Sequence, residues 1–207
     1  MVDETPMRAK VVRRPKGRRF YKLDNNYRLG GRPGLTLENE STLRSYVGYT
    51  GLNPRYAAFP EVPRFLFDKR LGRAPRDIEG FSGQWLISNR LKAVFEAVDR
   101  DALSFTPCEV RLPDGTEGPP RWLCTVVRVL DALDEEASRI TIGEDQGQKC
   151  YLLKAGMSLV FREETVGAAH MFRMAYFEPV VICDQFVKDN CQQAELKGIL
   201  FRDVLKR

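Results

Sequence analysis

The chain has 207 residues, of which 43% are hydrophobic and 29% charged, and its formal net charge is +5. This composition excludes collagen-like, coiled-coil and wholly disordered proteins, and no apolar run reaches the roughly 18 residues that a membrane span needs. We therefore expect one globular domain with no membrane contact, which at this length buries about 70% of its unfolded surface.

The positive charge is concentrated in the first part of the chain. Residues 1–80 contain 17 Lys and Arg against 9 Asp and Glu, a balance of +8, whereas residues 81–207 contain 16 against 19, a balance of −3. We predict that residues 1–22 form a basic, flexible arm, because like charges repel and this stretch is too polar to collapse. The residues of the arm that would contact a polyanion are Arg13, Arg14, Lys16, Arg18 and Arg19.

Two roles besides plain solvation stay open for this arm. It could contact an acidic protein, or it could bind nucleic acid through the release of counterions from phosphates. Phe20 and Tyr21 have rings that could stack on bases, but no nucleic-acid recognition motif surrounds them. The residues therefore favour a solvated arm over nucleic-acid binding.

The rest of the chain, residues 23–207, is predicted to form a single α+β domain. Its first part, 23–80, is dense in turn-forming residues and is expected to be irregular. Residues 62–67 are typical of a short strand with a proline at its edge. The main sheet and the helices are expected within 81–207.

A strand, a capped helix and a hairpin are predicted from residue 84 onward. An apolar strand at 84–87 leads to Ser88, whose side chain can accept a hydrogen bond from the first helical turn. Apolar residues then recur at helical spacing as far as residue 98. Strands at 104–112 and 122–130 follow as an antiparallel hairpin with a long, proline-containing loop. Further strands are predicted at 139–142, 151–153, 158–161 and 171–176.

The last segment repeats this order. An apolar strand at 180–183 leads to Asp184 at a helix-cap position, and a second helix and a strand at 199–204 follow. At a fixed offset of 96 residues, Ser88 aligns with Asp184 and Phe105 with Phe201. This predicts two strand–helix–strand units that pack their helices on a shared sheet. The fold class that follows is α+β, with a mostly antiparallel sheet and few helices.

The sequence offers few groups for a catalytic or metal site. The single histidine, His170, ends a loop before a predicted strand, where a structural role is the commoner one. No Cys-x-x-Cys or His-x₃-His pair is present for zinc, and residues 30–34 lack the spacing of a phosphate-binding loop and predict a turn. We predict no catalytic residue, no metal, no cofactor and no enzyme activity, although an enzyme site that the fold assembles around His170 stays open as an alternative.

The cysteines indicate a reducing compartment. Five is an odd number, so the cysteines cannot all pair within one chain, and the polar, acidic segment 1–6 does not resemble a secretory signal. We expect reduced thiols and a cytoplasmic location. Cys183, next to the predicted cap Asp184, follows an apolar run and is expected to be an inert core thiol.

Several short segments occur in a distinctive order from residue 62 onward. They are PRFLF (63–67), DI (77–78), LISNRLK (86–92), FTPCEV (105–110), VVRVLDALD (126–134) with Ser138, VICDQFV (181–187) and GILF (198–201). This order, which covers about two-thirds of the chain, resembles the eleventh immunity-protein family of bacterial polymorphic toxin systems. One departure is Asp184, because a serine commonly opens the second helix in that family; aspartate caps a helix equally well.

The resemblance implies a small protein, encoded beside a toxin, that binds the toxin and neutralises it. The family supplies no catalytic residues. A specific protein interface relies on a few aromatic and arginine side chains, and the segment 44–76 is rich in both. The candidate partner-binding residues are Tyr46, Tyr49, Arg55, Tyr56 and Arg64. The partner is expected to be a cognate protein toxin; neither its identity nor the oligomeric state of this chain can be inferred from the sequence.

Overall fold

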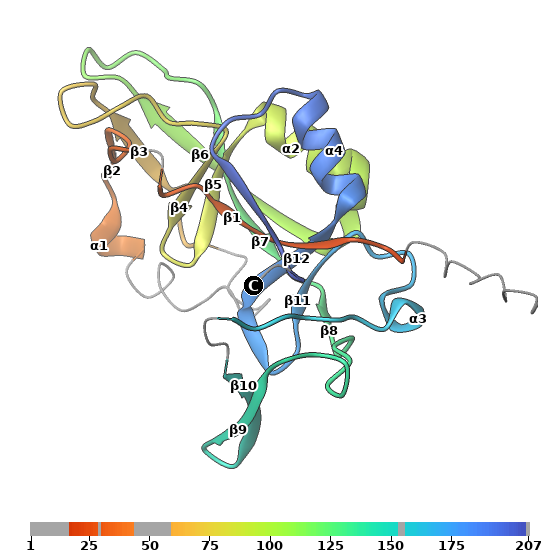
Figure 1. Ribbon diagram of the computed structural model, residues 1–207. Helices are drawn as coiled ribbons and strands as arrows, with labels where there is room; N and C mark the ends of the chain where they lie inside the picture. The colour runs from red at the N-terminus through yellow and green to blue at the C-terminus, as the bar shows by residue number, and fades with distance from the viewer. Residues whose placement is uncertain (1–16, 29, 44–58, 153–155, 206–207) are drawn as a thin grey trace, which may run out of the picture.

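The computed structural model describes residues 17–28, 30–43, 59–152 and 156–205. Within these ranges the chain forms two larger sheets, a two-stranded hairpin and four α-helices (Figure 1). Most strand pairs are antiparallel; only β3 with β6 and β8 with β11 are parallel. The predicted α+β class with few helices is confirmed. In the described part of the chain, no helix is long and apolar enough to cross a bilayer.

The first sheet has six strands in the order β2-β3-β6-β7-β5-β4. Their bounds are β2 Leu35–Leu37, β3 Arg64–Phe67, β4 Ile78–Phe81, β5 Gln84–Ser88, β6 Leu103–Arg111 and β7 Arg121–Val126. The predicted hairpin is confirmed as the antiparallel pair β6–β7. It ends earlier than expected, because the chain leaves this sheet after Val126.

The second sheet has five strands in the order β13-β1-β12-β11-β8. Their bounds are β1 Phe20–Asn25, β8 Val129–Leu130, β11 Met171–Met174, β12 Phe177–Asp184 and β13 Ile199–Asp203. β8, which was expected to continue β7, instead pairs with β11 in this sheet. The two-residue break at Val127 and Arg128 thus carries the chain from one sheet to the other.

The predicted arm is wrong at its inner end. Residues 20–22 belong to β1, which lies between β12 and β13 and is antiparallel to both. Phe20, Tyr21 and Leu23 are buried, so this segment has the apolar content that a sheet interior requires. Residues 1–16 lie outside the described part of the chain, and their predicted flexibility stays a prediction.

The remaining elements are short. β9 (Thr141–Asp145) and β10 (Gln148–Leu152) form a hairpin that projects from the lower end of the molecule in Figure 1. α1 spans Glu40–Leu43 and α3 spans Glu163–Val166. The strand predicted at 158–161 does not form; Ser158 and Phe161 make only isolated bridges, although Leu159 and Phe161 are buried as the apolar pattern indicated.

The two predicted strand–helix–strand units both form. One runs from β5 through α2 (Asn89–Asp99) and the short 3₁₀ helix η3 (Arg100–Ala102) to β6, and the other from β12 through α4 (Gln185–Gln193) to β13. Both caps are confirmed: Ser88 accepts from the backbone N–H of Leu91 and Asp184 from that of Val187, each at 3.2 Å.

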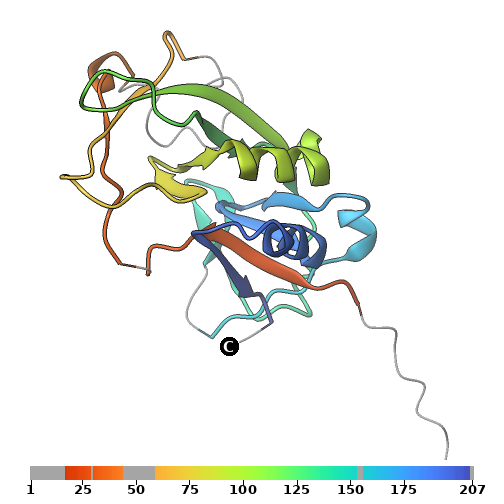
Figure 2. The same cartoon turned by 90° about the horizontal axis from the view of Figure 1, so that it is seen from above.

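The units do not share a sheet, contrary to expectation. Each is a split βαβ unit, in which the two parallel strands leave room for one antiparallel strand between them. β7 fills the gap in the first unit, and β1 fills it in the second. The helices α2 and α4 pack against each other, side by side in Figures 1 and 2, and so join the two sheets.

The main core lies where the two units meet. It contains apolar side chains of both sheets and of both helices, including Leu91 and Phe95 of α2 and Val187 and Cys191 of α4. Smaller cores cover the outer faces of the sheets, around Phe65 on the first and around Phe172 on the second. Full burial of one such side chain contributes about 1.5–3 kcal/mol, so the packing of α2 on α4 stabilises the whole arrangement.

Candidate partner-binding surface

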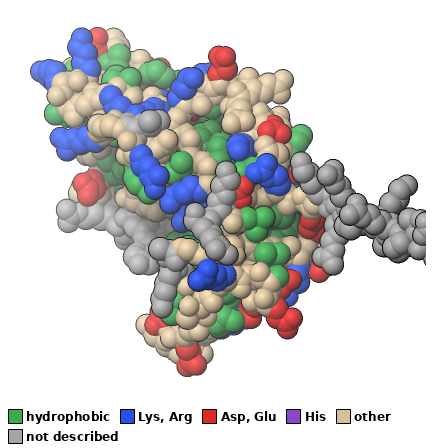
Figure 3. Space-filling model, viewed as in Figure 1, with side chains coloured by type: hydrophobic (Ala, Val, Ile, Leu, Met, Phe, Trp, Pro, Cys, Tyr) green, Lys and Arg blue, Asp and Glu red, His purple; other side chains and the backbone are tan. Residues whose placement is uncertain are grey.

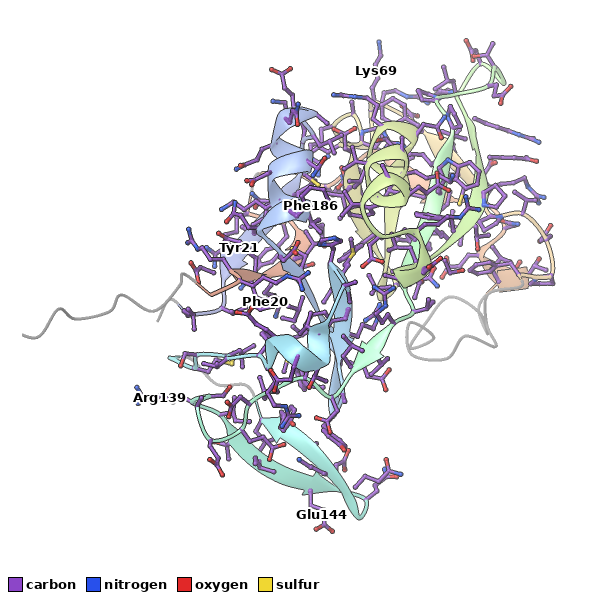
Figure 4. The ribbon with its side chains drawn as sticks, turned by 90° about the vertical axis from the view of Figure 1, so that its right-hand side faces the viewer. Phe20, Tyr21, Lys69, Arg139, Glu144 and Phe186 are labelled. Atoms are coloured by element: carbon purple, nitrogen blue, oxygen red, sulfur yellow. The ribbon has the colours of Figure 1, made fainter. Side chains whose placement is uncertain are left out.

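Charge is segregated between the two ends of the molecule. Lys69 and Glu144 lie at opposite ends in Figure 4. Lys and Arg side chains gather at the end that carries β2 and β3, whereas Asp and Glu side chains are prominent at the tip of the β9–β10 hairpin (Figures 1 and 3). Such an arrangement orients a charged partner before contact.

The basic end is built on two loops that interlock. The loops are residues 30–34, before β2, and residues 68–73, after β3. The backbone N–H of Gly34 donates to the carbonyl of Arg73 at 2.9 Å, and the N–H of Arg73 donates to the carbonyl of Arg32 at 3.1 Å. The N–H of Asp68 donates to the carbonyl of Gly34 at 2.8 Å. We call this pair the clasped loops.

Two glycines make the crossing possible. A Cβ atom on Gly72 would overlap the carbonyl oxygen of Arg32 and lie 2.8 Å from the backbone nitrogen of Gly34. A Cβ atom on Gly34 would overlap the carbonyl oxygen of Asp68 and lie 3.0 Å from the nitrogen of Gly72. Backbone approaches this close admit only glycine. The turn predicted at 30–34 is therefore one half of a two-loop structure.

The clasped loops carry four cations and one carboxylate, a net charge of +3: Arg32, Lys69, Arg70 and Arg73 against Asp68. Arg32 and Lys69 are exposed and form no ion pair with a carboxylate in the described ranges, and Leu71 between them is 46% exposed. We call Arg32, Lys69, Arg70 and Leu71 the basic face. Arginine is enriched among the residues that contribute most to binding at protein interfaces.

Two ion pairs hold the basic face in shape. Arg70 donates to the buried carboxylate of Asp68, and this hydrogen bonding lowers the pKa of Asp68. Arg73 donates to Glu79 of β4 and to the carbonyl of Gly31, so its side chain braces the loops against the sheet. The pKa of Arg73 is raised by its hydrogen bond with Glu79. The surface is thus pre-formed rather than assembled on binding.

Of the predicted partner-binding residues, the structure describes Arg64 alone. It begins β3, lies next to the loop 68–73 along the chain, and pairs with Glu61 at 3.0 Å. Its backbone N–H donates to Asn39, a buried residue that also donates to the carbonyl of Val62. Tyr46, Tyr49, Arg55 and Tyr56 lie outside the described residues.

The sequence reasoning missed Arg32, Lys69 and Arg70. The density of arginine and lysine between residues 64 and 76 was a usable signal, but the contact between two loops nearly 40 residues apart was not visible in it.

The five residues predicted to contact a polyanion have different positions in the structure. Arg13, Arg14 and Lys16 lie outside its described ranges. The side chain of Arg18 is bound within the protein: its guanidinium donates to the buried carboxylate of Asp184 at 2.6 Å and to the carbonyl of Gly167 at 2.8 Å. Arg19 keeps a mostly exposed side chain and pairs with Asp203 at 2.9 Å. The interior role of Arg18 argues against its use as a polyanion contact.

His170 belongs to the same cluster as Arg18. Its Nδ1 lies 2.8 Å from Asp184, and its ring lies 4.8 Å from that of the half-exposed Phe186. The neighbouring thiol of Cys183 is fully buried, and burial raises its pKa, so it stays protonated and unreactive. Within the described residues, no group of three or more metal-ligating side chains occurs. The cluster ties the segment before β1 to the end of β12 and the start of α4; the structural role of His170 stays a prediction.

Similarity to known proteins extends over nearly the whole chain at the level of the family. A search of curated proteins finds no match. The model of the Immunity protein family (Imm11) matches residues 19–206, which includes β1, both split βαβ units and the clasped loops. The match agrees with the resemblance that the ordered segments carry. The chain therefore belongs to the Imm11 family of immunity proteins.

Proposed function

We propose that this protein neutralises a cognate bacterial toxin by docking its basic face onto an acidic surface of that toxin. The proposal is carried by the exposed cations of Arg32 and Lys69, which have no carboxylate partner in the described ranges and stand on glycine-clasped loops. Membership of an immunity family supports a toxin partner in general. A cytoplasmic location, where the toxin would meet its inhibitor, is part of the proposal.

The rigidity of the loops supports a direct docking role. A surface that is already ordered loses little conformational entropy on binding, so more of the contact energy appears as affinity. Arginine also presents a planar fork of donors that matches a carboxylate. The charge segregation supports fast, oriented association, which falls as salt screens the field.

The experiment is charge reversal at the basic face, measured with the product of the adjacent gene as the toxin. Arg32→Glu and Lys69→Glu are compared with Arg139→Glu, which reverses an exposed cation away from the basic face (Figure 4). We expect each basic-face variant to weaken toxin binding by at least about tenfold, mostly through the association rate, and to reduce protection of cells. The Arg139 variant should stay within about twofold of the parent.

Equal effects of all three reversals would contradict docking through the basic face. The nucleic-acid alternative is separated by a second measurement, on a chain that lacks residues 1–16. If the arm binds nucleic acid, this truncation should abolish a salt-sensitive affinity for DNA or RNA; under our proposal it leaves toxin binding unchanged.

A further inference from the structure

A second site is formed where strands of the two sheets face each other, on the side of the β4–β5 hairpin. A pocket of about 270 Å³ lies between β1 and β12 on one side and the β4–β5 hairpin and β7 on the other. Its walls include the side chains of Leu23, Trp85 and Val181, with Asn25 and the β4–β5 turn at one side. This pocket is separate from the clasped loops.

A buried arginine lies at this pocket. Arg173 of β11 is 5% exposed and lines the pocket. Its Nε donates to the carbonyl of Val126 in the first sheet at 2.7 Å, and its Nη1 donates to the carbonyl of Glu178 in the second sheet, also at 2.7 Å. The guanidinium therefore bridges the two sheets, and the donors of Nη2 form no hydrogen bond within the described part of the chain.

The charge of Arg173 has no paired counter-ion among the described residues. Cys124 lies beside it, but burial raises the pKa of this thiol, which therefore stays neutral. The carboxylate of Glu178 is near enough to raise the pKa of Arg173, yet it forms no ion pair with the guanidinium and does not line the pocket. Lys22 and Asp24, which also line the pocket, carry opposite charges, and Asp24 lies 3.8 Å from Arg202.

Two carbonyls and the nearby Glu178 carboxylate partly balance the Arg173 charge, and a guanidinium with free donors binds a carboxylate well. One positive charge balances one negative charge, so a monoanionic carboxylate suits this site better than a phosphate. The volume is just below the usual range for ligand pockets, and within a largely polar lining Leu23, Trp85 and Val181 offer apolar contact to a short hydrocarbon chain. We propose that this pocket binds a carboxylate on a short apolar stem, supplied by a small free acid or by an Asp or Glu side chain of the partner.

Trp85 in the pocket wall offers a direct readout. The chain has two tryptophans, so a Trp122→Phe background leaves Trp85 as the sole indole emitter. Butyrate is titrated into this protein at constant ionic strength, with chloride and phosphate as comparison anions. We expect a saturable change in Trp85 emission with butyrate, and weaker or no response to the other anions. The absence of a saturable butyrate response, or tighter binding of phosphate, would overturn the proposal.

Three variants test the role of Arg173. Arg173→Met should weaken butyrate binding at least about tenfold, since a hydrogen bond to a charged group is lost. Arg121→Met is the matched control: Arg121 is also buried and donates to two backbone carbonyls, but it does not line the pocket. Pro179→Phe obstructs the pocket from an exposed position and keeps Arg173. Unchanged binding in the Pro179 variant would refute the site even if Arg173→Met fails to fold.

A second experiment identifies the source of the carboxylate, and its interpretation rests on the proposed function. Saturating butyrate should compete with the toxin if a side chain of the toxin occupies the pocket. Toxin binding that butyrate leaves unchanged would assign the pocket to a free acid instead. The titration followed by Trp85 emission needs no toxin, so its failure is distinguishable from failure of the docking proposal.

Discussion

Replacement of Gly72 by alanine tests the clasped loops most directly. The added Cβ would overlap the carbonyl of Arg32, which is backbone and cannot rotate away, so the two loops must separate. Separation breaks the three backbone hydrogen bonds that cross between Gly34, Arg73 and Asp68 and their partners. Each contributes about 1 kcal/mol. Alanine also reduces the freedom of the unfolded chain, which returns up to about 1 kcal/mol, so we expect a net loss of about 2 kcal/mol.

The assay is equilibrium unfolding in urea. With a slope of about 2 kcal/mol per molar, this loss lowers the midpoint by about 1 M. Gly30→Ala is the control: unlike Gly72, Gly30 has a left-handed backbone (φ +38°), and no heavy atom lies within 4 Å of the place that its Cβ would occupy. An alanine at position 30 adds backbone strain of about 1 kcal/mol, which the reduced freedom of the unfolded chain offsets. A midpoint for Gly72→Ala within about 0.2 M of the parent would refute the steric argument.

Three further predictions concern the caps and the thiols. Asp184→Ala should lower the free energy of unfolding by about 3–5 kcal/mol, since it removes a buried ion-pair partner as well as a helix cap. Ser88→Ala removes only a cap and should lower the free energy of unfolding by about 1 kcal/mol. Urea unfolding of both variants checks this difference, and equal losses of stability would contradict it. At about pH 8, near the ordinary pKa of a thiol, a thiol reagent should label the half-buried Cys150 well before the buried cysteines, as mass spectrometry of partly labelled protein will show. Burial raises the pKa of Cys108 and of Cys191 from 9.0 to about 12. The unfolded thiols ionise first, so stability should fall between about pH 9 and pH 12, and less steeply once Cys108 is replaced by alanine.

The two long helices could be predicted from local sequence signals, whereas the arrangement of the sheets could not, because it depends on contacts between residues far apart in the chain. Ser88 and Asp184 are caps because short polar side chains follow apolar strands, which a reader of the sequence can see. The role of β1 could not be seen, because its partners lie more than 150 residues away and the basic run before it suggested a solvated arm. The alternation of Phe20, Tyr21 and Leu23 with polar neighbours was the overlooked strand signal.

The candidate surface shows the same division. Arg64 was predicted from the local abundance of aromatic and basic residues, whereas the proposed role of Arg32 and Lys69 depends on the close contact between Gly34 and Gly72. The chain has sixteen glycines, and the sequence does not show which two of them lie in contact in the fold. Likewise, nothing near Arg173 in the chain indicates that its side chain joins two carbonyls in different sheets.

The central place of β1 has a consequence for the time at which the chain can fold. Its neighbours are β12 and β13, and Phe20 pairs with Asp184. A ribosome that adds about 5–20 residues per second needs roughly 10–30 s between these two positions. Throughout that interval the apolar side chains of β1 have no sheet to join. The second sheet therefore closes only when nearly the whole chain has been made, so this half of the molecule matures late in its synthesis.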